Sequence, residues 1–177
     1  IPEFNHLSAR GGVWAVPGNH EYYAGIEAFD SFCKATAMRP LVNRHDQPLP
    51  GLVLAGVDDV NGTRFGTAGP NLGAALEGVP TGSFILLMNH QPLQFQEAVA
   101  RGVKLQVSGH THAGQIPPLE FFIGLVFQYP HGLYRHGDGA LYVSPGTGTW
   151  GPPMRLISRS EITVFVLKKG PLKTSDQ

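Results

Sequence analysis

Short apolar runs that end in glycine, proline or another turn-forming residue are the feature that most limits what this chain can fold into. Four of them lie at residues 11–18, 52–57, 83–88 and 103–107. Their apolar residues are mostly continuous rather than alternating, which is typical of strands buried on both faces of a sheet. Segments with helical spacing lie between them, at residues 26–38, 72–76 and 95–100. This order of elements predicts an α/β fold.

The C-terminal part of the chain has a different pattern. Residues 141–148 (LYVSPGTG) and 161–169 (EITVFVLKK) are predicted to be sheet strands joined by Gly and Pro turns. No internal repeat, low-complexity stretch or linker interrupts the 177 residues, and this length suits one core. We therefore expect a single domain over residues 1–177.

Charge and composition exclude several classes of partner. The 13 basic and 13 acidic residues balance, and no basic block exceeds the pair Lys168 and Lys169, so no nucleic-acid partner is expected. Cys33 is the only cysteine and cannot form an internal disulfide. Neither a signal peptide nor an apolar run long enough to span a bilayer is visible, which predicts a cytoplasmic or peripheral membrane location.

Three motifs present Asn or His directly after an apolar run: VPGNHE at 16–21, LMNHQP at 87–92 and VSGHTH at 107–112. The carboxyl ends of strands in an open α/β sheet form the usual ligand crevice, so these motifs are expected to face one site. Neutral imidazole is a common metal ligand, and the Asn carbonyl is a hard oxygen donor. The motifs therefore predict a metal site. The histidines in other contexts are interpreted as structural or surface residues: His6, His45, His131 and His136.

The ordered series GNHE, NH and GHTHAGQ resembles the motifs of the calcineurin-like metallophosphoesterases. The tail GLYRHGDGALYVSPGTGTWGPPMRL, followed by EITVFVL, is similar to a bacterial subgroup whose members are often membrane-associated. This resemblance implies a metallophosphoesterase-type β-sandwich flanked by helices. It also implies a metal-dependent hydrolase of phosphomonoesters or phosphodiesters that uses a divalent metal such as Mn, Zn, Fe or Ni.

The same resemblance implies a role for each candidate residue. Asn19, His90 and His110 would bind the second metal of a dinuclear site, and His112 would bind the first. The catalytic candidates are His20, which would contact the phosphate or protonate the leaving group, and Glu21, which would orient His20.

Two motifs of the resembled family, Asp-x-His and Gly-Asp-x-x-Asp, are absent from these 177 residues. They supply the first metal's other ligands and the carboxylate that bridges the two ions. The resemblance therefore implies a truncated domain without its first strand, helix and second strand, holding one ion or none and impaired in activity. Uncovered strand edges invite pairing, so a homo-oligomer is expected.

Two other functions stay open at this point. One is a non-catalytic remnant that binds a metal or an anion and oligomerises. The other is a hydrolase of carboxylic esters; the chain has no Gly-x-Ser-x-Gly elbow, and its Ser-x-x-Lys match, Ser31 to Lys34, is a weak signal.

The apolar stretch LEFFIGLVF at 119–127 also has two interpretations: a buried part of the core, which ordinary burial preferences favour, or an exposed lip that touches lipid. Its nine residues are too few to span a bilayer. The turn that contains Trp150 is expected to pack near the site.

Overall fold

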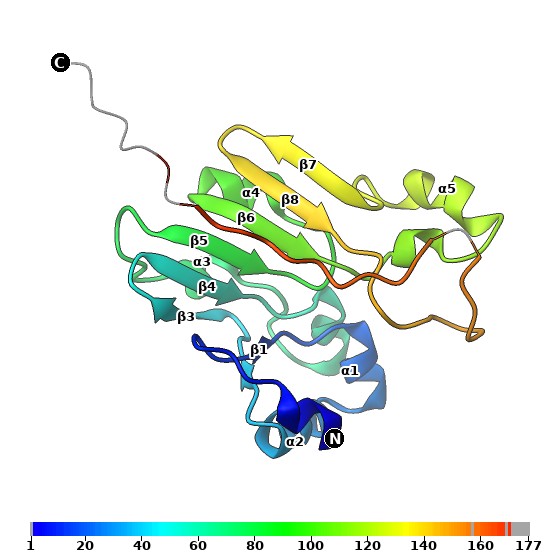
Figure 1. Ribbon diagram of the computed structural model, residues 1–177, viewed down its shortest axis with the longest axis horizontal. Coiled ribbons are helices and arrows are strands. Elements are labelled where there is room, and N and C mark those ends of the chain that lie inside the picture. Colours follow the sequence, from blue (N-terminus) through cyan, green and yellow to red (C-terminus); the bar gives the residue numbers. More distant parts are fainter. Residues whose placement is uncertain (1, 157, 169, 171–177) are drawn as a thin grey trace.

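A mixed six-stranded sheet forms the centre of the molecule (Figure 1). The computed structural model describes residues 2–156, 158–168 and 170. The order across the sheet is β3 (Arg44–Leu49), β4 (Leu52–Gly56), β5 (Phe84–Met88), β6 (Val103–Ser108), β8 (Gly139–Val143) and β7 (Gly132–His136). The four inner strands run parallel, while β3 and β7 pair antiparallel at the two edges. The predicted α/β fold is confirmed.

Two helices pack on one face of this sheet and complete its core. They are α3 (Leu72–Leu76) and α4 (Phe95–Ala100), at the positions that the apolar spacing predicts. Side chains of α3 and α4 pack with β4 and β5 residues such as Val53 and Leu87, which are fully buried. Phe95 of α4 packs on Leu141 and Val143 of β8. Along β4 and β5 the residues that pack with α3 and α4 are buried, and most of those that alternate with them are half-buried, so both faces favour apolar side chains.

The N-terminal part adds short elements beside the main sheet. In chain order they are η1 (Pro2–His6), β1 (Trp14–Ala15), α1 (Asn19–Ala24), α2 (Ile26–Ala35), β2 (Arg39–Pro40) and η2 (Val60–Phe65). The strand predicted at 11–18 is confined to β1, which pairs parallel with β2 in a separate two-stranded sheet. The helix predicted over 26–38 ends at Ala35, where the Thr36 hydroxyl donates to the Phe32 carbonyl at 2.8 Å.

The edge strands β3 and β7 have no counterpart in the predicted elements. β3 reads RHDQPL and β7 reads GLYRH, so neither carries the apolar run that marks the inner strands. Within the part of the chain that the structure describes, each has a single strand neighbour, which leaves one side of its backbone outside the ladder. Edge strands tolerate proline and charge for that reason.

The strand predicted at 161–169 is wrong over the described residues 161–168, which form no strand, and Lys169 lies outside the described residues. The segment instead crosses the sheet on the side away from α3 and α4 (Figure 1). Tyr142 of β8 anchors it there: its hydroxyl donates to Glu161 Oε1 at 2.5 Å, and its ring packs against Phe165 with centroids 5.4 Å apart. Alternating apolar residues thus face water instead of a second strand.

The exposed apolar residues of the 161–168 segment are expected to make the protein self-associate. Ile162 and Val164 are 83% and 80% exposed, and Val166 is similarly open. Apolar residues alternating along an extended backbone favour pairing with another chain. We expect the protein to self-associate in light scattering, and the triple change Ile162→Thr, Val164→Thr and Val166→Thr to lower its average mass toward the monomer. An unchanged mass in the triple variant would contradict this.

Candidate metal centre

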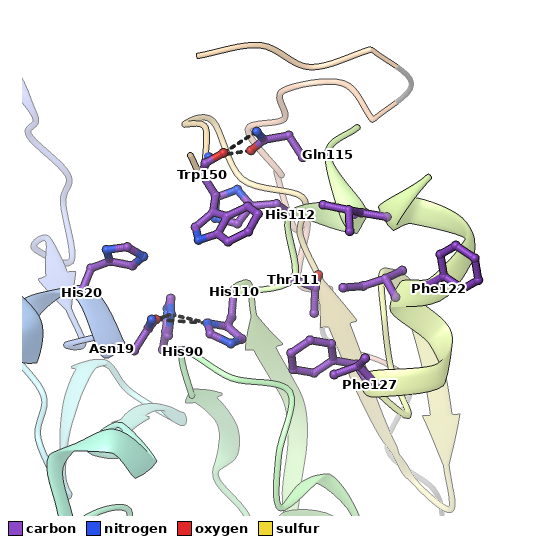
Figure 2. A pocket seen from close by; sticks show the side chains of 14 residues that line it. Asn19, His20, His90, His110, Thr111, His112, Gln115, Phe122, Phe127 and Trp150 are labelled. Atoms are coloured by element: carbon purple, nitrogen blue, oxygen red, sulfur yellow. Dashed lines mark hydrogen bonds between the residues drawn. The ribbon is translucent and has the colours of Figure 1, made fainter. Parts of the chain in front are cut away.

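Three loops at one edge of the structure carry the candidate residues. Asn19 and His20 begin α1, directly after β1. His90 follows β5, and His110 follows β6. Because β5 and β6 are parallel neighbours, both histidines come to the same edge of the sheet. Figure 2 shows the side chains of Asn19, His90 and His110 pointing toward one another.

The donor atoms of these three side chains form a small triangle. Asn19 Oδ1 lies 2.9 Å from His90 Nε2 and 3.1 Å from His110 Nδ1, and the two ring nitrogens are 3.1 Å apart. Atoms that each lie about 2.0–2.2 Å from one cation have neighbour separations of this size. Two imidazole nitrogens and one amide oxygen are ligands that Zn, Mn, Fe or Ni accepts. The arrangement therefore fits one divalent cation with coordination positions left open.

Carboxylate and thiolate ligands are missing from this triangle. In the described part of the chain, no three His, Cys, Asp or Glu side chains gather closely enough to hold a metal ion. The third donor of the triangle is an amide, which carries no charge. We expect a weaker site than one that includes a carboxylate, because no negative ligand offsets the charge of the cation.

The backbone near these ligands is specialised. A Cβ atom on Gly18 would lie 2.8 Å from three atoms of the His90 ring, so the Gly of GNHE is needed for close approach. In the GHTHAGQ loop, positive φ angles occur at His110 (71°), His112 (51°), Ala113 (51°) and Gln115 (57°). Such angles are uncommon outside glycine and cluster at functional sites.

His90 and His110 both favour the neutral form. Burial lowers the pKa of His90, although the Asp59 carboxylate acts in the opposite direction. Burial and the neighbouring His90 lower the pKa of His110 to about 4. Neutral imidazole has the free electron pair that a cation requires. Both rings are therefore in the protonation state that a metal ligand would need at neutral pH.

The metal-free protein should lose stability as the pH falls from about 6.5 to 4. Unfolded histidine binds a proton near pH 6.5, whereas His110 in the fold does so only near pH 4. The unfolded state therefore binds more protons in this window, and the free energy of unfolding falls by up to about 1.4 kcal/mol per pH unit for each such histidine. Urea titrations of EDTA-treated protein would measure this. A His110→Ala variant with the same pH slope would contradict it.

The structure places His112 apart from the triangle. It begins the short turn η3 (His112–Gly114) and lines the same cavity. Its Nδ1 lies 3.2 Å from Nη2 of Arg155, which also donates to the carbonyl of Pro145 at 2.6 Å. Burial and the Arg155 charge lower the pKa of His112. Its role as a ligand of a first metal stays a prediction.

His20 and Glu21 lie beside each other in α1 but have different surroundings. His20 is exposed and lines the cavity, with its ring edge-on to Tyr23 at 5.6 Å between centroids. Glu21 Oε2 accepts the Gly18 N–H at 2.7 Å, which caps the start of α1. This hydrogen bond holds the loop that carries Asn19. Glu21 therefore has a partner other than His20, and its predicted orienting role stays a prediction.

Sequence reasoning missed two residues that shape the site, Gln115 and Arg155. Gln115 is 1% exposed, and its Nε2 donates to the Trp150 carbonyl at 2.6 Å while its Oε1 accepts the Trp150 N–H at 2.5 Å. This pair of bonds fixes the loop that carries Trp150, which lines the cavity as expected (Figure 2). The sequence signal that could have pointed to Gln115 is its amide side chain directly after the glycine of GHTHAG.

The 119–127 stretch forms α5 (Leu119–Val126), which has no buried residue. The prediction that it is part of the core is wrong, because it packs mainly on η3 at the rim of the structure (Figure 1). Gly114 permits this contact: a Cβ atom there would lie 2.2 Å from Glu120 Cα. A cavity of about 380 Å³ lies between α5 and the histidines.

Ser31 and Lys34 lie on α2, where both are exposed and neither lines this cavity. His45, by contrast, is structural as predicted, because its Nδ1 is 3.0 Å from the Ala75 carbonyl oxygen.

Comparison with known proteins defines the class of this chain. The family model for calcineurin-like phosphoesterases matches residues 2–114, so the chain belongs to that family. Its relatives include an "uncharacterized metallophosphoesterase" of Helicobacter pylori J99, 40% identical over 165 residues, or 92% of this chain and 44% of the relative. A Danio rerio "transmembrane protein with metallophosphoesterase domain" is 37% identical over 175 residues, or 92% of this chain and 40% of the relative.

An "uncharacterized metallophosphoesterase" of Aquifex aeolicus is 36% identical over 164 residues, or 89% of this chain and 61% of the relative. The chain thus spans less than half the length of the Helicobacter and Danio relatives. No solved structure matches significantly. Among the described residues, no helix is both long and apolar enough to cross a bilayer.

Proposed function

We propose that this chain contains the phosphate-binding centre of a metal-dependent hydrolase of phosphomonoesters or phosphodiesters. The convergence of Asn19 Oδ1, His90 Nε2 and His110 Nδ1 within 3.1 Å of one another carries this proposal. A divalent cation bound there would polarise a phosphoryl oxygen and lower the pKa of a bound water. Membership of the calcineurin-like phosphoesterase family supports the same chemistry.

The residues around the ligand triangle would bind the phosphate, protonate the leaving group or hold the ligands in position. His20 lies on the cavity wall, where its imidazole can donate to a phosphate oxygen or protonate a leaving alkoxide. His112 lines the cavity and forms a second polar pair with Arg155, whose Nη2 lies 3.2 Å from His112 Nδ1. The Glu21 carboxylate holds the N-terminus of α1 and thereby the position of Asn19.

Metal binding without turnover is the second candidate function. The absence of carboxylate donors at the triangle favours it, since a bridging carboxylate is what the resembled family uses to hold two ions together. Such a chain would bind one cation, or an anion through that cation, and hydrolyse nothing.

Activity with and without metal separates the two candidates. Metal-stripped protein would be reloaded with Mn²⁺ and assayed on p-nitrophenyl phosphate and bis(p-nitrophenyl) phosphate. We expect turnover that EDTA abolishes and that a serine-directed reagent leaves intact. Bound Mn²⁺ without turnover would favour the binding function. Turnover of a carboxylic ester that resists EDTA and is blocked by the serine reagent would contradict both.

A further inference from the structure

The cavity beside the metal centre has one polar wall and one apolar wall. The polar wall contains Asn19 and the four site histidines. The opposite wall is made by five apolar residues at α5: Leu119, Phe122, Ile123, Val126 and Phe127. The two walls meet where the rings of Phe127 and His110 lie edge to face, 5.5 Å apart (Figure 2). A group bound at the ligand triangle is therefore in reach of both.

The outer side of α5 is apolar as well. Phe121 and Leu125 are 71% and 83% exposed and do not line the cavity. Glu120 is the only charged residue of the helix. A surface helix normally turns charged residues to water, so a helix that is apolar on both sides is suited to an apolar medium. Its eight residues are too few to cross a bilayer but enough to lie in its surface.

We propose that the substrates of this site are phosphate esters of long-chain lipids. The phosphate would sit at the triangle of Asn19, His90 and His110, and the chain would run along Phe122 and Ile123. The outer side of α5, with Phe121 and Leu125, contacts the lipid surface from which the substrate is drawn. This inference rests on the proposed phosphoesterase function. A small polar ester would leave the apolar wall unused, whereas each buried methylene of a lipid strengthens binding by up to about fourfold.

Binding of alkylphosphonates, which are not hydrolysed, tests the apolar wall of the cavity without relying on activity. Calorimetry with Mn²⁺-loaded protein would compare butylphosphonate with octylphosphonate at concentrations where both are monomeric. We expect octylphosphonate to bind at least about tenfold more tightly, because four more methylenes are buried. The double variant Phe122→Ala with Ile123→Ala should remove this preference. The matched control, Phe121→Ala with Leu125→Ala, should keep it because those residues lie outside the cavity.

Sedimentation with vesicles tests whether the outer side of α5 binds a lipid surface. It also distinguishes a substrate that is held in a membrane from a free amphiphile. We expect the protein to sediment with phosphatidylcholine vesicles, and the Phe121→Ala with Leu125→Ala variant to lose this while still preferring octylphosphonate. Equal affinity for the two phosphonates would overturn the lipid inference and leave the phosphoesterase proposal standing. Failure of both phosphonates to bind in the presence of Mn²⁺ would contradict the phosphate site itself. Octylphosphonate preference without vesicle binding would overturn the lipid-surface contact.

Discussion

Changing His90 to alanine is expected to lower the affinity for Mn²⁺ or Zn²⁺ at least about 10- to 100-fold, and phosphoesterase turnover with it. Loss of residues that merely orient metal ligands has effects of this size, so loss of a ligand should equal or exceed them. His90 Nε2 lies 2.9 Å from Asn19 Oδ1 and 3.1 Å from His110 Nδ1, so its removal opens one corner of the triangle. Two donors remain, Asn19 Oδ1 and His110 Nδ1.

Calorimetric titration of metal-stripped protein would measure the effect. His6→Ala is the matched control, because His6 is an exposed residue of η1 outside the cavity. Circular dichroism would verify that the His90 variant folds. Unchanged metal affinity in a folded His90→Ala variant would rule out the triangle as the metal site, whatever its activity.

The second large effect is expected at Gln115, where alanine should lower the free energy of unfolding by about 2 to 4 kcal/mol. The change leaves the Trp150 N–H and carbonyl without the partners that now lie 2.5 and 2.6 Å away. It also empties a site that is 1% exposed. Trp150 is 51% exposed, so each lost hydrogen bond costs about 0.5 to 1.5 kcal/mol, and the volume that the Gln115 side chain leaves empty adds to this cost.

Urea unfolding and limited trypsin digestion would measure this change. Cleavage after Arg155 should accelerate, because the variant loses the side-chain hydrogen bonds that hold the preceding loop, including the one from Gln115 Nε2 to the Pro152 carbonyl at 3.3 Å. Gln96→Ala makes the same chemical change at an exposed position of α4 and should stay within about 0.5 kcal/mol of the parent. Equal stability and equal cleavage rates in the two variants would show that Gln115 does not hold the loop.

The inner strands could be predicted from the sequence because one of their faces is buried and the other is largely half-buried, which favours apolar side chains in succession. β4, β5 and β6 coincide with the predicted runs to within one or two residues. The edge strand β3 could not be found in this way. Its sequence, RHDQPL, faces water on one side and contains a proline that an inner strand would exclude.

Apolar character alone misled the prediction in two places. Residues 161–168 alternate as a strand does, yet no neighbouring strand is hydrogen-bonded to them within the described structure. The 119–127 stretch is apolar enough for a core, but its helix lies at the rim because it is docked mainly on the η3 turn. Hydropathy reports what a residue prefers, whereas its burial depends on which other segments are near.

The sequence by itself determined which residues could serve as ligands, because Asn and His after apolar runs must come to strand ends. It also determined the family, through the order of three short motifs. Only the tertiary structure decided that Asn19, His90 and His110 converge while His112 turns to Arg155. Side chains that are 71 and 91 residues apart come within hydrogen-bond distance through the parallel pairing of β5 and β6 and the packing of α1. Such contacts depend on register and loop geometry, which no local pattern of residues specifies.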